Sequence, residues 1–116
     1  MLGFQNQEVY RAAVELVGFA HRIAPASDDA ILQRLRFTTL TIPVDVASVA
    51  PAPERKEAHA AARSSAVESA VLLDTLQACG TIDDAEHAGG MTLIGRVLAG
   101  LKKGESGAGK RGGATM

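Results

Sequence analysis

Hydrophobic side chains recur along this chain at the spacing of helix faces, in four successive segments. Over residues 5–24, apolar side chains return every three or four positions while charged ones share the other side, which is typical of an amphipathic helix. The same spacing continues over 28–49, 54–79 and 83–103. Proline residues separate the first three segments, because proline interrupts a helix interior. The pattern therefore predicts four helices.

The second segment supports two interpretations. Ser27 is a suitable N-cap, and the two aspartates that follow it suit a helix amino terminus. Apolar residues then advance in steps of three and four, which favours a helix with a bend at Pro43. The stretch 37–49 is also rich in β-branched residues, which intrinsically prefer strands. A strand over this stretch is the alternative to a helix.

The third helix carries a seam of inward positions whose steps alternate between four and three, as in a heptad repeat. The seam consists of Ala58, Ala62, Ser65, Ser69, Leu72, Leu76 and Cys79. Its first half has only small side chains, so it can approach another helix closely. We expect this half to serve helix packing or self-association, through Ala58, Ala62, Ser65 and Ser69. Cys79 is expected to be a small core residue.

Turn signals lie between the third and fourth helices. Gly80 suits the left-handed position after a helix, and Thr81 with Asp84 has the spacing of a capping box. Gly89 and Gly90 predict a bend or a late start of the fourth helix, because glycine weakens a helix interior.

Short connectors between the four helices predict an all-α fold, an antiparallel up-and-down four-helix bundle over residues 1–103. The composition agrees, because the 47% apolar share comes mostly from Ala, Val and Leu, with few aromatic residues. Residues 104–116 are Gly-rich with almost nothing to bury, which predicts a flexible, disordered tail.

Cysteine content and hydropathy bear on the compartment. Cys79 is the only cysteine, so no internal disulfide can form. No stretch approaches the ~20 apolar residues of a membrane span, and the first residues do not resemble a signal peptide. We expect a soluble, cytoplasmic protein that does not associate with membranes.

Motifs for catalysis are weak. Residues 104–110 read Gly-Glu-Ser-Gly-Ala-Gly-Lys, close to a phosphate loop, but Arg111 replaces the Ser or Thr that would hold magnesium, and a helix precedes the motif where a strand is needed. Asp84-x-x-His87 is one carboxylate–histidine pair where a bundle metal site needs two. Neither Cys79 nor the serines of the third helix have a histidine fixed beside them. We predict no enzyme activity, cofactor, metal ion or small-molecule substrate.

Charge is nearly balanced, with 12 basic and 13 acidic residues, which disfavours strong binding to nucleic acid. The end of the chain is nevertheless basic, since five cations oppose one carboxylate from residue 96 onward. An ordinary solvated surface explains these charges, and nucleic-acid contact is the alternative. The candidate contacts are Arg34, Arg36, Arg55, Lys56, Arg63, Arg96, Lys102, Lys103, Lys110 and Arg111.

Three short stretches resemble a known family. Residues 41–47, Thr-Ile-Pro-Val-Asp-Val-Ala after Leu35-Arg36, are similar to its Ser-Ile-Pro-x-Asn-Ile-Ala-Glu-Gly. Residues 62–68, Ala-Arg-Ser-Ser-Ala-Val-Glu, are similar to its Ala-x-Gly-Ser-x-x-Glu, and residues 94–101 to its final helix. The family is that of the four-helix bundle proteins encoded by intervening sequences in bacterial 23S rRNA genes. It includes accessory variability determinants of diversity-generating retroelements.

The resemblance implies a non-enzymatic, oligomeric binding or scaffold protein whose copies assemble into a ring, often a pentamer. The alternative that it implies is an accessory protein of a diversity-generating retroelement, which binds a reverse transcriptase and RNA or DNA. Asp45 stands where the family has Asn, and Ser48-Val49 where it has Glu-Gly.

Overall fold

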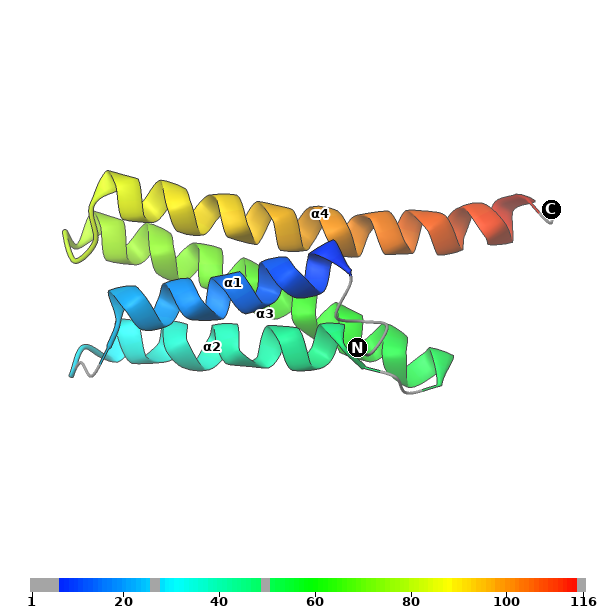
Figure 1. The fold of residues 1–116 in the computed structure, drawn as a ribbon, viewed down its shortest axis with the longest axis horizontal. Helices are drawn as coiled ribbons and strands as arrows, with labels where there is room; N and C mark the ends of the chain where they lie inside the picture. The colour runs from blue at the N-terminus through cyan, green and yellow to red at the C-terminus, as the bar shows by residue number, and fades with distance from the viewer. Residues whose placement is uncertain (1–6, 26–27, 49–50, 115–116) are drawn as a thin grey trace.

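The computed structural model describes residues 7–25, 28–48 and 51–114, with side chains up to residue 102. Within these residues there are four α-helices and no strand. They are α1 (Glu8–Ile23), α2 (Ala30–Val46), α3 (Ala52–Ala78) and α4 (Asp84–Ala114). Each helix runs antiparallel to the next (Figure 1). Because α1 and α3 both pack on α2 and α4, the four close into a bundle, and the predicted fold class is confirmed.

The helix ends differ from the predicted ones for local reasons. The N-cap of α2 is Asp29 rather than Ser27, because Asp29 Oδ1 accepts hydrogen bonds from the backbone N–H groups of Ile31 (2.8 Å) and Leu32 (3.1 Å). α3 starts at Ala52 rather than at residue 54, with Pro53 in its first turn. α4 continues past residue 103, to Ala114. The predicted disorder concerns residues 104–116, whose side chains lie outside the described part.

The strand alternative for the second segment is wrong. α2 remains helical through its β-branched residues, and Pro43 lies inside it. Threonine hydroxyls bond back to the carbonyls of the preceding turn, from Thr39 to Arg36 (3.2 Å) and from Thr41 to Thr38 (3.0 Å). Tertiary packing outweighs the strand preference, since one side of α2 is buried against the other helices. That side comprises Leu32, Leu35, Thr38, Thr39, Ile42 and Val46.

The heptad pattern of α3 is present in a neighbouring register. Its buried residues are Ala62, Ala66, Ser69, Leu73 and Leu76, which alternate steps of four and three. The predicted role of Cys79 in the core is wrong, because Cys79 caps α3 at the end of the bundle and is exposed.

The α3–α4 turn closes with two capping motifs. Gly80 has φ of +74°, as predicted for the position after a helix. The N–H of Gly80 donates to Gln77 O (3.0 Å) and that of Thr81 to Leu76 O (2.9 Å), which is a Schellman motif. The capping box differs from the predicted pair. It joins Asp83 and Glu86, whose backbone N–H groups each bond the other's carboxylate at 3.0 and 2.7 Å.

α4 begins at Asp84, so the predicted late start at Gly89 and Gly90 is wrong. Glycine serves close packing there. A Cβ at Gly90 would lie 2.5 Å from Leu73 Cδ1, and one at Gly100 would lie 2.6 Å from Val9 Cβ. α4 therefore approaches α3 and α1 more closely than any side chain would allow. Within the described residues, no helix is both long enough and apolar enough to cross a membrane.

Candidate interaction surface

The outer side of α2 is apolar and exposed. Phe37 is 65% exposed, Leu40 53% and Val44 72%, at steps of three and four that place them on one face. This face is opposite the buried Leu35 and Ile42, so α2 has apolar side chains on both sides. Val14 of α1, 45% exposed, lies next to Leu40 and Val44. We call Val14, Phe37, Leu40 and Val44 the α2 patch.

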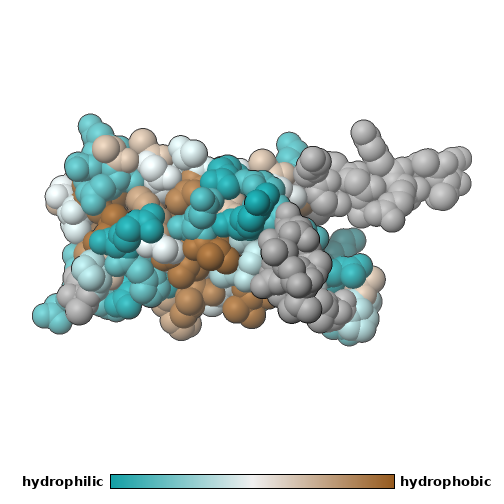
Figure 2. Space-filling view, viewed as in Figure 1, coloured by the Kyte–Doolittle hydropathy of each residue, from teal (hydrophilic) through white to brown (hydrophobic). Residues whose placement is uncertain are grey.

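A groove follows the α2 patch along its border with α1. Its volume is about 350 Å³, and every lining residue is apolar or aromatic. In Figure 2 hydrophobic surface gathers over α1 and α2 on the same face. The lining residues are Tyr10, Val14, Val17, Leu40, Pro43, Val44 and Ala47. The groove extends the patch from a row of side chains into a hollowed apolar surface.

An ion pair borders the α2 patch on the side of α3. Arg34 Nη2 lies 2.8 Å from Glu68 Oε1, and Arg34 Nε donates to Glu68 Oε2 at 3.1 Å. The Thr38 hydroxyl also donates to this carboxylate. The bond from Arg34 and, after it, the bond from Thr38 lower the pKa of Glu68. The bond to Glu68 and the attraction to its charge raise the pKa of Arg34. Residues 37–44 carry no charge, and the two charges of this ion pair cancel. Asp45 follows Val44 directly, and burial raises the pKa of its carboxyl group.

The outward face of α3 is less apolar. Its exposed large apolar side chains are Val67 (49%) and Val71 (57%), which lie one turn apart. The residues predicted for packing or self-association lie on the other side of α3. Ala62 and Ser69 are fully buried, so their side chains leave nothing for a second copy to contact. Their role is helix packing.

The other two predicted packing residues, Ala58 and Ser65, are half-buried. Ser65 Oγ lies 3.2 Å from the Thr41 hydroxyl, so it joins α3 to α2 within the chain.

Three of the predicted nucleic-acid contacts are bonded within the chain. Arg96 donates to Glu8 Oε1 (2.9 Å, through Nε) and to Glu15 Oε2 (2.6 Å), which raises its pKa. Arg34 is paired with Glu68 as described above. Arg36 donates to the Pro25 carbonyl at 3.5 Å. These arginines already have acceptors within the chain.

The remaining candidates differ in exposure. Arg55, Lys56 and Lys102 are exposed at the end of the bundle where α3 begins, and Arg63 is half-buried. The side chains of Lys103, Lys110 and Arg111 lie outside the described part, and so does the motif that resembles a phosphate loop.

The residues considered for catalysis or metal binding are kept apart. His87 Nε2 lies 2.7 Å from Asp74 Oδ1, whereas Asp84 Oδ1 accepts from Gln77 Nε2 at 2.9 Å. Among the described side chains, no three of His, Cys, Asp or Glu could hold a metal ion together. Ser69 donates to the backbone carbonyl of Ser65 at 2.8 Å, as helical serines commonly do.

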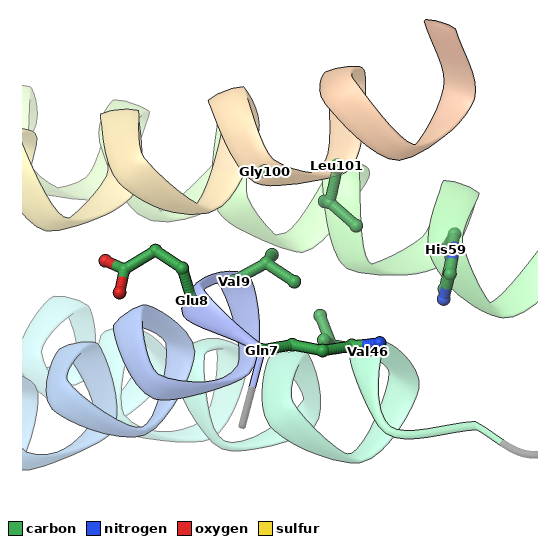
Figure 3. Close-up of a pocket in the computed structure, with 7 residues that line it drawn as sticks. All are labelled: Gln7, Glu8, Val9, Val46, His59, Gly100 and Leu101. Atoms are coloured by element: carbon green, nitrogen blue, oxygen red, sulfur yellow. The ribbon is translucent and has the colours of Figure 1, made fainter. Parts of the chain in front are cut away.

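A second hollow of about 380 Å³ lies at the end of the bundle where α1 begins (Figure 3). Val9, Val46 and Leu101 give it an apolar lining from three helices, and His59 contributes from α3. In Figure 3 the Glu8 carboxylate points away from His59, so the two do not form an acid–base pair. The hollow adds apolar surface without reactive groups in contact.

The α2 patch was not predicted from the sequence. A signal was present, because residues 37–44 form an uncharged run within a helix that already has a complete inward stripe. In comparisons with known proteins, no family model and no curated protein matches the chain. The resemblance to the 23S rRNA intervening-sequence family remains a prediction.

Proposed function

We propose that this chain is a non-enzymatic scaffold protein that assembles with copies of itself through the outer face of α2. The observation that carries the proposal is the exposure of Phe37, Leu40 and Val44 side by side on one helix. Contiguous apolar patches of this kind mark interaction sites on soluble proteins, because leaving them in water is unfavourable. Aromatic and aliphatic residues without charge are also typical of interface centres.

A second copy is the partner that the electrostatics favour. The α2 patch is nearly neutral, because its neighbouring Arg34 and Glu68 neutralise each other. The net charge of the chain is −1, so two copies repel each other weakly. A strongly charged partner would gain little from this surface, whereas an identical apolar surface loses no charge solvation when it docks.

The ring implied by the family resemblance is one form of such an assembly. A ring needs two different surfaces on each subunit, because its interfaces are heterologous. The α2 patch and the pair Val67 and Val71 on α3 are two such surfaces. A two-fold pair needs the α2 patch alone.

Light scattering coupled to size-exclusion chromatography tests the proposal. We expect the unmodified protein to be oligomeric at micromolar concentration and Leu40→Asp to be monomeric, with its helical circular dichroism retained because Leu40 is 53% exposed. Thr92→Asp, an exposed position on α4, is the control and should leave the oligomer intact. A monomeric unmodified protein across the micromolar range would refute self-assembly.

Nucleic-acid binding is a second candidate, supported by the exposure of Arg55, Lys56 and Lys102 at one end of the bundle. Glu54 and Glu57 flank the first two and weaken the local positive charge. If the candidate is correct, duplex DNA or structured RNA is retained at low salt and released steeply as salt increases. No retention at low salt by the full chain would remove it.

A further inference from the structure

We infer that two copies pair through α2 in antiparallel orientation about a two-fold axis near Leu40, so that Phe37 of each copy packs against Val44 of the other. This inference rests on the proposed self-assembly and specifies its interface.

The spacing of the α2 patch fits an antiparallel pair. Along the helix, Phe37 precedes Leu40 by about 4.5 Å and Val44 follows it by about 6 Å, at ~1.5 Å per residue. If two such helices run in opposite directions, Phe37 of one copy lies opposite Val44 of its partner, and the two Leu40 side chains meet near the axis. The contact then occurs twice, as two-fold symmetry requires.

The shape of the surface also suits this pairing. Phe37 is 65% exposed and is the largest side chain of the α2 patch. Val44 borders the apolar groove of about 350 Å³ between α1 and α2. A Phe37 ring that packs on the partner's Val44 therefore reaches the rim of a hollow that can receive it. In a parallel pair the two Phe37 rings would meet each other, and both grooves would remain open to water.

Charge distributed along the bundle favours the antiparallel direction. Apart from Arg34, which is paired with Glu68, the end that contains the α1–α2 and α3–α4 turns (Figure 1) carries six carboxylates and two arginines, a local charge of −4. The remaining charge is +3, but +2 of it belongs to residues 103–111, whose side chains lie outside the described part. The six carboxylates are Asp28, Asp29, Asp74, Asp83, Asp84 and Glu86, and the arginines are Arg22 and Arg36.

The antiparallel pair keeps the two acidic ends apart, at opposite ends of the complex. A parallel pair would place two ends of −4 side by side, and like charges disfavour such a complex. Electrostatics thus selects between the two directions that the apolar contacts alone would permit.

Cysteine cross-linking tests the direction of the pair. The exposed Cys79 is first replaced by serine, and single cysteines are then introduced as Gln33→Cys or Ser48→Cys, which the antiparallel register places opposite each other. In this pair, the two copies of residue 33, or the two copies of residue 48, would be about 22 Å apart along the helix axis, at ~1.5 Å per residue. With a short bis-maleimide, we expect cross-linked dimers in a mixture of the two variants and none in either variant alone.

Each other outcome overturns a specific claim. Self-cross-linking of Gln33→Cys alone would refute the antiparallel direction. An oligomer by light scattering without any α2 cross-link would refute pairing through α2 and leave self-assembly standing. A monomer would refute both.

Matched substitutions of two valines distinguish a two-fold pair from a ring. We expect Val44→Asp to raise the dissociation constant of the pair by about 100-fold or more, because it buries an unpaired charge. Val67→Asp, the same change on the outward face of α3, should leave that constant unchanged. A ring that joins the α2 patch to α3 would respond to both substitutions, and equal effects would therefore overturn the two-fold pair.

Discussion

Gly100 of α4 lies so close to Val9 of α1 that a Cβ at residue 100 would be 2.6 Å from Val9 Cβ and 3.3 Å from Val9 Cα. Part of this contact is with backbone, which cannot turn aside as the end of a side chain can. The crossing of the first and last helices is therefore fixed by the absence of a side chain.

Gly100→Ala is expected to lower the free energy of unfolding by about 1 kcal/mol. The helix gains ~1 kcal/mol when alanine replaces glycine, but forcing a methyl group into a filled contact costs ~1–3 kcal/mol. Gly95→Ala is the control on the same helix, because nothing lies within 4 Å of its added Cβ. It should raise stability by about 1 kcal/mol. Urea denaturation compares the two, and a stabilised Gly100→Ala would show that α1 and α4 can separate freely.

Leu35→Ala and Leu40→Ala test the two sides of α2. Leu35 is fully buried, so its truncation is expected to cost about 2–5 kcal/mol. Leu40 is 53% exposed, and its truncation should cost less than about 1 kcal/mol in the monomer.

Denaturation at several protein concentrations compares the two variants. The stability of Leu40→Ala, which should lose self-association, is expected not to depend on protein concentration, whereas that of Leu35→Ala should still depend on it. Equal costs for the two variants at high dilution would contradict the orientation of α2.

Gly80→Ala should destabilise the protein by about 1–2 kcal/mol, because φ of +74° places Cβ too close to the following carbonyl. No atom lies within 4 Å of the added Cβ, so the cost is conformational and not a clash. Gly80→Asn should cost less, since asparagine tolerates the left-handed region better. Thermal unfolding ranks the three proteins, and an unchanged Gly80→Ala would mean that the turn adopts another conformation.

Stability should fall as the solution is acidified through the folded-state pKa of Glu68. Hydrogen bonds from Arg34 and Thr38 hold this pKa below its ordinary value of 4.5. The carboxylate thus stabilises the fold fully above pH 4.5, and the contribution disappears as the pH drops through the lowered pKa. Glu68→Gln should flatten the decline in stability below about pH 5, as measured by chemical denaturation. If Glu68→Gln loses stability on acidification as steeply as the unmodified protein, other carboxylates cause the decline.

The helical segments could be predicted because the spacing of apolar residues in α1 and α3 is regular over many turns. The ends of the helices were harder to predict. Ser27 and Asp29 are both good caps, and only the positions of the Ile31 and Leu32 amides decide between them. In α3, alanine and serine are so frequent that two heptad registers fit the sequence, and burial selects the one through Ala66 and Leu73.

The interaction surface could not be predicted from periodicity because α2 is apolar on two sides. Its inward stripe explains the helix completely, so Phe37, Leu40 and Val44 look like part of an apolar core until the neighbouring helices are placed. Pairing of Arg34 with Glu68 and of Arg96 with Glu8 depends on residues 34 and 88 positions apart. Such partners follow from the arrangement of the helices and not from local sequence.

The contact of Arg96 with Glu8 and Glu15 also has a consequence for biosynthesis. α4 is synthesised after α1, so the face of α1 that α4 covers stays uncovered until α4 leaves the ribosome. Until then the nascent chain exposes an apolar seam. Chaperones that bind exposed hydrophobic segments would have to release this seam before the bundle can close.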